Sequence, residues 1–314
     1  MKHALAGLPR RLRPLLPALA VAGLALAAWA LRDLARTVHP AEIGAALRAI
    51  PPRRLAAALA LTAANYAVLT LYDVLALRYA GQRLPYRRSA LASFCGYAVS
   101  IALGHAVVTG GAVRARLYGR WGVPSEAVGQ VIGFCGLAFW MGFLSLGAVV
   151  LLVAPLRVPA SFPVPARALG AVLGAAFLLY LGLNAWRKAP LRLWRWQMTL
   201  PGVRTTLAQA AVASADLALA AAVLAVLLPV DGPPLGHVLS GYLLALIAGV
   251  LSAVPGGFGV FDGLMASFLA PPLPAAVAVA VLVAYRALYT LLPFALALAV
   301  LGGVEFRARR AVAP

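Results

Sequence analysis

Charged side chains are scarce in this sequence, and acidic ones are the scarcest. Only 11% of the 314 residues are charged, 63% are hydrophobic, and the mean hydropathy is +0.92. Soluble domains carry about 25% charged residues, because a surface in contact with water needs them. A soluble domain is therefore excluded. Long apolar runs recur from end to end, which predicts an all-α polytopic membrane protein with one integral membrane domain over residues 1–314.

Residues that bind metals or form disulfides are also few. The two cysteines, Cys95 and Cys135, lie inside apolar runs with no C-x-x-C pair, and the four histidines are scattered. This pattern argues against a disulfide framework and against a metal centre. We expect His105 and Cys135 to be packing residues. No Walker motif is present, so ATP hydrolysis has no support, and we predict no cofactor.

The excess of basic residues is large, with 27 Lys and Arg against eight Asp and Glu. These residues form short clusters between apolar runs, such as Arg10 and Arg11, Arg87 and Arg88, and Arg187 and Lys188. Topology signals and contacts with anionic lipid headgroups explain that layout. No aromatic and basic module typical of nucleic-acid binding is visible, so we expect lipids rather than nucleic acid as partners.

Eight segments approach the ~20 apolar residues that a membrane span needs. The first follows a basic stretch but ends at Arg32 and Asp33 without a small-residue cleavage site, so we interpret it as an anchor. The eight segments are Leu15–Leu31, Leu55–Leu77, Ser89–Val108, Val128–Val153, Ala168–Trp186, Leu207–Pro229, Gly236–Val254 and Ala275–Val304.

The third and seventh segments share an unusual pattern. The third runs into Gly110 and Gly111, and the seventh runs into Pro255, Gly256 and Gly257. Each pair of glycines is followed by a short amphipathic piece and a long apolar helix. We therefore predict backbone breaks at these five residues, because glycine permits conformations that a helix does not. Paired breaks in corresponding halves, here about 55–153 and 207–304, are typical of a transporter binding site.

The distribution of basic residues bears on topology. Eight full crossings would place 13 Lys and Arg on each side, with Arg286 inside the last segment. If the third and seventh segments instead enter and leave on one side, the inside holds 19 and the outside seven. The second arrangement fits the positive-inside rule better and makes the halves inverted. Both arrangements remain open, because each segment is also long enough to cross.

Three charged residues lie inside apolar segments: Asp73, Asp216 and Arg286. A charge at the bilayer centre costs about 2.5–3.5 kcal/mol on insertion scales, so such residues are paired or used. Asp73 could also be an interfacial acid that pairs with Arg78. Asp216 could belong to a structural ion pair, and Arg286 could be the structural partner of one of the acids.

Three further charged residues follow the glycine pairs. Arg114 and Arg116 come after the first pair, where they are either topology signals or ligands of a lipid phosphate, which a guanidinium binds in bidentate fashion. Asp262 comes after the second pair, where it is either a first-turn helix acid or a functional group.

These motifs together resemble the N-terminal membrane half of the MprF family, the bifunctional lysylphosphatidylglycerol synthetase/flippases. The resemblance covers roughly residues 55 to 305. It is carried by Thr109 to Tyr118, Trp121-Gly122 and Gly133 to Trp140, by Pro255 to Asp262, and by Ala284-Tyr285-Arg286 through Tyr289 and Pro293. The sequence departs from the family in two ways: Asp262 stands where the family usually has Glu, and the C-terminal aminoacyl-transfer domain is missing.

The resemblance implies lipid translocation rather than an enzyme. In the family this half moves aminoacylated phosphatidylglycerol from the inner to the outer leaflet of the cytoplasmic membrane. On that basis Arg114 or Arg116 would hold the phosphate, and Asp73, Asp216 or Asp262 would face a headgroup amine. Arg286 would balance the acids, and Tyr289 belongs to the same last-helix motif. The chain itself should not make the lipid, so a separate aminoacyl-lipid synthase is an expected partner, and a homo-oligomer stays open.

Two other functions also fit the sequence. The substrate could be another amphiphile, such as a hopanoid or an isoprenoid-linked glycan, since the synthase domain is missing. Alternatively, the chain could be a non-transporting membrane subunit of a lipid-modifying system, which would tolerate changes at Asp73 and Arg286.

Overall fold

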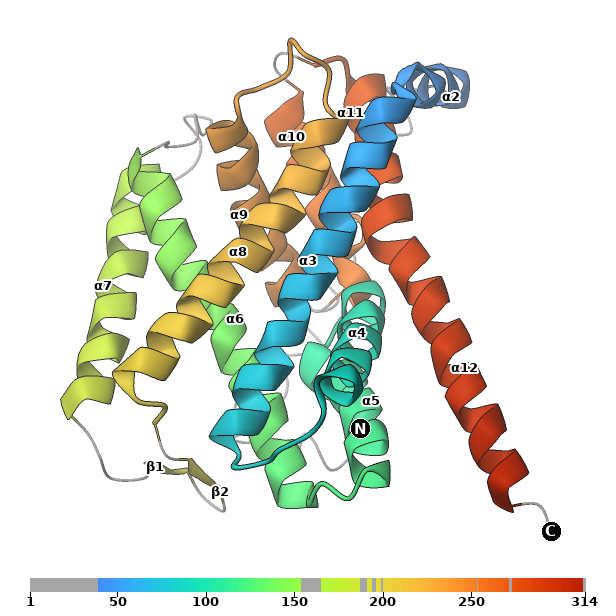
Figure 1. The fold of residues 1–314 in the computed structure, drawn as a ribbon. Helices are drawn as coiled ribbons and strands as arrows, with labels where there is room; N and C mark the ends of the chain where they lie inside the picture. Colours follow the sequence, from blue (N-terminus) through green and yellow to red (C-terminus); the bar gives the residue numbers. More distant parts are fainter. Residues whose placement is uncertain are drawn as a thin grey trace.

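The computed structural model describes residues 39–153, 165–186, 191–193, 196–198, 200–252, 254–270 and 273–312 (Figure 1). The predicted N-terminal segment Leu15–Leu31 lies outside these residues. Helices account for nearly all of the described chain, and one small antiparallel hairpin joins two three-residue strands. The bounds are α2 Pro40–Ala49, α3 Pro52–Tyr79, α4 Tyr86–Leu103, α5 Ala106–Arg120, α6 Ser125–Val153, α7 Ala166–Trp186, β1 Leu191–Leu193, β2 Trp196–Met198, α8 Val203–Leu227, α9 Leu235–Leu251, the 3-10 turn η2 Pro255–Gly257, α10 Val260–Leu269, α11 Ala275–Tyr285, the π-helical η3 Arg286–Leu291 and α12 Leu292–Val312.

Five of the described helices are long and apolar enough to cross a membrane. They are α3, α6, α7, α8 and the continuous helix made by α11, η3 and α12. The shortest of them has 21 residues, which corresponds to about 31 Å at 1.5 Å per residue and matches the hydrocarbon thickness. The predicted segments that correspond to these helices are confirmed as long apolar helices.

The third predicted segment, Ser89–Val108, is not one helix. Helix α4 ends at Leu103, the chain reverses at Gly104 and His105, and α5 begins at Ala106. Both turn residues have positive φ, +74° at Gly104 and +51° at His105. The Arg88 guanidinium at the start of α4 lies 5.9 Å from the Trp121 ring just after α5. The two helices therefore form a hairpin whose open end lies on one side.

The seventh predicted segment also ends early and forms a second hairpin. Helix α9 stops at Leu251, the turn η2 follows, and α10 returns. Positive φ occurs at Gly256, Gly257 and Gly259, so the backbone departs from helix geometry where the sequence predicts a break. At the open end, His237 Nε2 lies 2.9 Å from the carbonyl oxygen of Phe268.

The two hairpins enter the bundle from opposite ends. In Figure 1, α4 and α5 occupy the lower half and α9 and α10 the upper half. This arrangement matches the prediction of two re-entrant hairpins rather than eight crossings. The described ends of α3, α5 and α7 lie at the lower end of the bundle in Figure 1. A long helix, a hairpin and a long helix occur in this order twice, although an inverted repeat stays a prediction.

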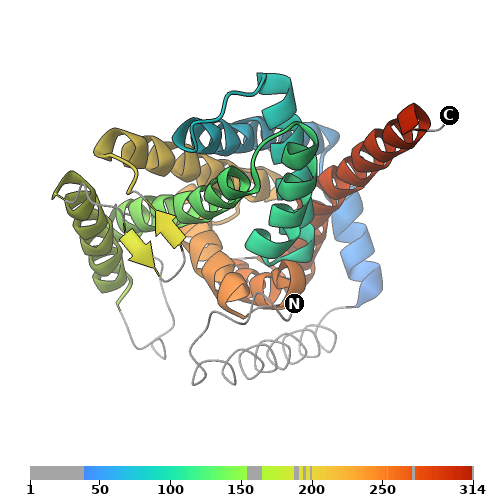
Figure 2. The same cartoon turned by 90° about the horizontal axis from the view of Figure 1, so that it is seen from below.

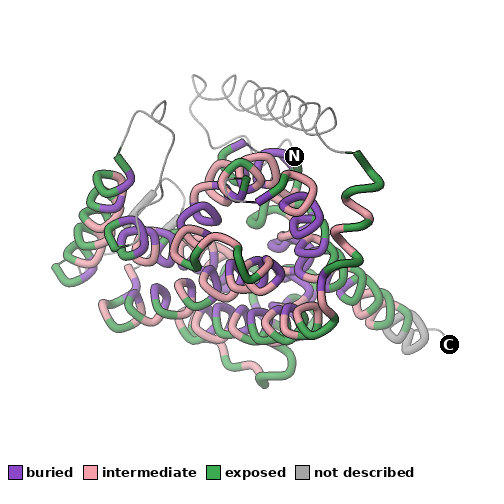
Figure 3. Tube along the Cα trace, turned by 90° about the horizontal axis from the view of Figure 1, so that it is seen from above, coloured by how far each residue is buried: buried purple, intermediate pink, exposed green. Residues whose placement is uncertain are grey.

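The core lies where α3, α6 and α8 pack together. Leu69, Phe134 and Leu224 are among its fully buried side chains. Seen from above, buried residues are most frequent toward the middle of the bundle and exposed ones toward its periphery (Figure 3). Seen from below, α7 and α12 lie at its periphery (Figure 2). The outer face of α7 exposes apolar residues such as Leu178 and Leu179, as expected of a helix that contacts lipid.

Candidate functional site

The first hairpin carries an ion pair that is sealed from its surroundings. Arg114 of α5 donates from Nε to Asp73 Oδ1 at 2.8 Å and from Nη2 to Asp73 Oδ2 at 2.7 Å. Tyr118 donates to Asp73 Oδ1 at 2.6 Å, and the guanidinium lies 4.4 Å from the Tyr97 ring centre. The side chains are only 3% and 0% exposed. Such a bidentate, charge-assisted pair satisfies both buried charges.

The glycines of the first hairpin serve packing rather than a backbone break. Gly110 and Gly111 lie inside helix α5, so the prediction that they interrupt the backbone is wrong. A Cβ atom on Gly110 would lie 2.1 Å from Ser100 Oγ and 2.7 Å from the Gly96 carbonyl oxygen. The two glycines still have a structural role, because small residues let two membrane helices approach closely. The break itself falls at Gly104, six residues before Gly110.

The second hairpin carries a matching ion pair that remains partly accessible. Arg286 donates from Nε to Asp262 Oδ1 at 2.9 Å and from Nη2 to Oδ2 at 3.1 Å. Its Nη1 donates to the Gly256 carbonyl at 2.9 Å, and the Gly259 amide donates to Asp262 Oδ2 at 3.1 Å. The Phe258 ring lies 4.5 Å below the guanidinium. The side chains are 12% exposed for Arg286 and 21% for Asp262.

The turns of the two hairpins touch each other. A Cβ atom on Gly104 would lie 2.9 Å from the Gly256 amide nitrogen, and one on Gly256 would lie 2.6 Å from the Ala102 carbonyl oxygen. Side chains larger than hydrogen do not fit there without movement. His105 is exposed beside this contact, so the expectation that it is a packing residue is wrong, whereas Cys135 is buried as expected.

Asp216 lies in a third polar cluster, between α8 and α3. Asn65 Nδ2 donates to Asp216 Oδ1 at 2.9 Å and to its carbonyl oxygen at 2.7 Å. The Tyr72 hydroxyl donates to Oδ2 at 2.9 Å. Tyr289 then donates to Asn65 Oδ1 at 3.0 Å, which ties the π-helical segment to the same cluster.

Aromatic rings connect this cluster to the second ion pair. The Tyr289 and Tyr285 rings stack at 5.1 Å, and the Tyr285 and Phe261 rings stack at 6.0 Å. The Arg286 guanidinium lies 5.1 Å from the Phe261 ring centre. The Tyr285 hydroxyl also lies 3.0 Å from that of Tyr242 on α9. Residues far apart in the sequence thus form one continuous network in the upper half and centre of the bundle.

Arg116 lies away from all three clusters. Its side chain is 60% exposed and shares Glu305 of α12 with Arg120, at 2.8 Å and 2.6 Å. The structure therefore ties the ends of α5 and α12 together at the lower end of the bundle. Arg116 is exposed at the surface there, as expected of a basic residue that sets membrane topology.

The sequence-predicted residues thus fall into separate pairs. Asp73 pairs with Arg114 rather than with Arg78, and Arg286 pairs with Asp262. Asp216 has no ion-pair partner among the described residues. The sequence alone did not predict that Asn65, Tyr72 and Tyr118 contact these acids, or that the chain turns at Gly104. Asn65 was detectable as a polar residue within an apolar run, whereas the tyrosines resemble ordinary interfacial aromatics.

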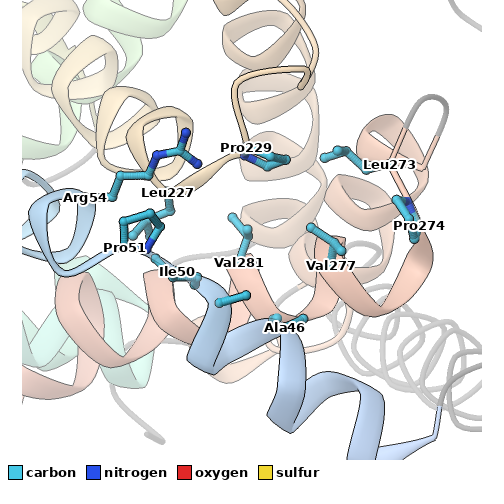
Figure 4. Close-up of a pocket in the computed structure, with 12 residues that line it drawn as sticks. Ala46, Ile50, Pro51, Arg54, Leu227, Pro229, Leu273, Pro274, Val277 and Val281 are labelled. Carbon is cyan, nitrogen blue, oxygen red and sulfur yellow. The ribbon is translucent and has the colours of Figure 1, made fainter.

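A separate apolar pocket of about 210 Å³ lies near the upper end, between α2, α3, α8 and α11 (Figure 4). Arg54 is its one charged lining residue, and its Nη1 donates to the Leu228 carbonyl at 2.5 Å. The remaining lining residues include Ile50, Leu227 and Val281. Cavities of about 150 Å³ lined by apolar residues bind small apolar molecules, but this pocket is distinct from the three polar clusters.

The fold and these clusters define a polytopic helical membrane protein in which two broken hairpins meet between long spanning helices. The comparisons with known proteins agree. The chain belongs to the family described as the lysylphosphatidylglycerol synthase transmembrane region, which matches residues 18–297. This membership confirms the resemblance and connects the chain with membrane lipids.

Two curated relatives are similar over most of their length. The uncharacterized protein slr0712 of Synechocystis sp. (strain ATCC 27184 / PCC 6803 / Kazusa) is 36% identical over 277 residues, covering 85% of this chain and 84% of that protein. The inner membrane protein YbhN of Escherichia coli (strain K12) is 28% identical over 272 residues, covering 84% of each chain.

Proposed function

We propose that this protein moves a phospholipid between the leaflets of the bacterial cytoplasmic membrane, with phosphatidylglycerol or its aminoacyl derivative as substrate. The observation that carries the proposal is the contact between the two hairpin turns, at Gly104 and Gly256, beside a partly exposed ion pair. Broken helices that meet between two halves are a common way to build a substrate site in a membrane transporter.

The chemistry of the second ion pair suits a lipid headgroup. A guanidinium presents five N–H donors, and Arg286 uses three of them for Asp262 and Gly256. The remaining donors are available to a phosphate oxygen, and the Asp262 carboxylate has capacity for an amine. The sealed pair of Asp73 and Arg114 offers no such access. We therefore assign headgroup contact to Arg286 and Asp262, and a supporting role to Arg114.

Family membership and the inner-membrane relative support this function without defining the substrate. The family description names a lysylated phosphatidylglycerol, which is anionic at the phosphate and cationic at the amines. A substrate with both charges fits an arginine and an aspartate that lie side by side.

The test compares lipid exposure in a deletion strain and its parent. An amine-reactive, membrane-impermeant label would report aminoacyl-phosphatidylglycerol in the outer leaflet. We expect exposure to fall on deletion, to recover with the wild-type chain, and to stay low with Asp262→Asn or Arg286→Gln. Glu305→Gln, which changes an acid far from the hairpin turns, is the matched control and should restore exposure.

Equal exposure in the deletion strain and the parent would contradict the proposal. Absence of any aminoacylated lipid in both strains would exclude that substrate. A normal level of exposure with both Asp262→Asn and Arg286→Gln would remove the headgroup role from this pair.

A further inference from the structure

Asp216 differs from the two other acids that lie inside the bundle. Asp73 and Asp262 each accept two hydrogen bonds from an arginine, which neutralises their charge. In the described part of the chain, none of the four ion pairs includes Asp216. Its side chain is nevertheless buried, with the residue 8% exposed, in the middle of a helix that spans the membrane. A buried carboxylate without a counter-charge is costly, so it either takes up a proton or needs a cation beside it.

The immediate neighbours of Asp216 supply hydrogen bonds but no charge. Asn65 and Tyr72 each donate one hydrogen bond to the carboxylate. A carboxylate has about four lone-pair sites, so two acceptor positions stay open. Among the residues that the structure describes, the titratable side chains that interact electrostatically with Asp216 are phenols. They are Tyr66 and Tyr72 of α3, Tyr242 of α9 and Tyr289 of η3.

No described residue on the other helices that pack against α8 forms an ion pair with Asp216 either. Cys135 of α6 is a buried free thiol, and the hydroxyl of Tyr180 on α7 is uncharged and has no hydrogen-bond partner among the described residues. Tyr285 of α11 faces Tyr242 and Arg286, and Arg286 is committed to Asp262.

Unpartnered oxygen atoms lie on the elements that surround Asp216. Thr62 is 3% exposed and Thr290 is 1% exposed, and neither hydroxyl has a hydrogen-bond partner. Thr62 precedes Asn65 by three residues on α3, so both lie on one helix face. Thr290 follows Tyr289 in the π-helical segment, a type of bulge that frequently marks functional sites. A buried oxygen without a partner calls for an explanation, and a bound ion is one of the explanations that such atoms have in membrane transporters.

We propose that Asp216 binds a small monovalent cation, either a proton or Na⁺, with help from the oxygens of Thr62, Thr290 and Asn65. The bound cation would supply the missing charge, and its movement down a gradient would drive the lipid step. This last clause rests on the proposed function, whereas cation binding does not. Membrane carboxylates in transporters serve as proton sites, and carbonyls at interrupted helices coordinate Na⁺.

The experiment measures thermal unfolding of the purified full-length protein in detergent, without any lipid assay. One series replaces choline chloride by NaCl at constant ionic strength and pH, and a second lowers the pH without Na⁺. A ligand that binds only the folded state raises the melting temperature, by about 5 °C at a concentration 100-fold above its dissociation constant. We expect the wild-type protein to respond in one series, which identifies the cation.

Variants then assign the response to the site. Asp216→Asn should abolish it, and Glu305→Gln, which changes an acid at the lower end of the bundle outside both proposed sites, should retain it. Thr290→Val should shift the midpoint to a higher cation concentration, and this variant tests the site even if Asp216→Asn does not fold. A wild-type melting temperature that is constant in both series would overturn the proposal. A full response in Asp216→Asn would do the same. Neither outcome would affect the lipid-exposure result.

Discussion

The two hairpins use the same components in opposite ways. In the first, the arginine lies on the hairpin, at Arg114, and the acid lies on the preceding spanning helix, at Asp73. In the second, the acid lies on the hairpin, at Asp262, and the arginine lies on the following spanning helix, at Arg286. Each hairpin is thereby fastened to one long helix by a bidentate ion pair.

The difference between them lies in burial and in the turn. The first turn needs only Gly104 and His105, and its ion pair is at most 3% exposed. The second turn has three glycines with positive φ, at 256, 257 and 259, and its ion pair is 12–21% exposed. A looser turn leaves its charges within reach of a ligand, whereas a tight turn seals them in. The first hairpin therefore acts as a structural support and the second as the candidate contact site.

Removal of the sealed arginine should have the largest effect on stability. Arg114→Gln leaves Asp73 buried without a cation, which typically costs about 3–5 kcal/mol. Arg286→Gln should cost less, because Asp262 is partly exposed and can be solvated. Unfolding of the purified protein in detergent measures both. The double variant Asp73→Asn/Arg114→Gln should be more stable than Arg114→Gln alone. Equal losses of stability in Arg114→Gln and Arg286→Gln would contradict the conclusion that the first ion pair is sealed and the second is accessible.

Substitution of the glycine at the first turn should come next. Gly104 has φ +74° and ψ −173°, a region that is nearly restricted to glycine and costs about 1–3 kcal/mol for other residues. A Cβ atom would also lie 2.9 Å from the Gly256 nitrogen. We therefore expect Gly104→Ala to lower the melting temperature and to reduce lipid exposure, because it separates the turns. Unchanged values of both would show that the contact between turns is dispensable.

Replacement of a glycine elsewhere on the first hairpin should have the opposite effect on stability. Gly119 lies near the end of α5, is exposed, and has no atom within 4 Å of an added Cβ. Gly119→Ala should stabilise the protein by about 0.5–1 kcal/mol, because alanine favours a helix more than glycine does. The same unfolding measurement checks this. A loss of stability would indicate contacts at this end of α5 that its exposure does not suggest.

The smallest effect is expected at the lower end of the bundle. Glu305→Gln removes the ion pairs with Arg116 and Arg120, and these side chains are 30–60% exposed. Exposed pairs contribute little and are screened by salt. The melting temperature should fall only slightly at low salt and match that of the wild type at high salt. A large decrease in melting temperature that persists in high salt would show that these ion pairs hold the first hairpin in place.

Much of the architecture was predictable because it depends on the composition of local segments. Apolar length identified the spanning helices, and the charge count favoured two hairpins over two further crossings. The position of the first break was not predictable in the same way. Gly104 and Gly110 are both glycines in an apolar stretch, and only the approach of α4 shows that Gly110 is a packing residue.

The candidate site was predictable as a set of residues but not as a set of contacts. The sequence indicated that Asp73, Asp216 and Arg286 would be paired or used, because a charge is expensive in a membrane, and it singled out Arg114 and Asp262 after the glycine pairs. It did not indicate which charges would pair, since any of several acids could have met either arginine. Nor did it assign a role to Asn65 or Tyr72, whose roles follow only from their distance to Asp216.

The sequence by itself determined that this protein lies in a membrane as a helical bundle with two interrupted segments. Scarcity of charge and the length of apolar runs decide this, because a bilayer accepts only backbone whose hydrogen bonds are satisfied within the chain. The tertiary structure alone decided which charges neutralise each other, which glycines bend the chain, and which acid is left without a cation. Those outcomes depend on contacts between residues more than 20 and often more than 100 positions apart, such as Asn65 and Asp216, and local sequence carries no record of such distances.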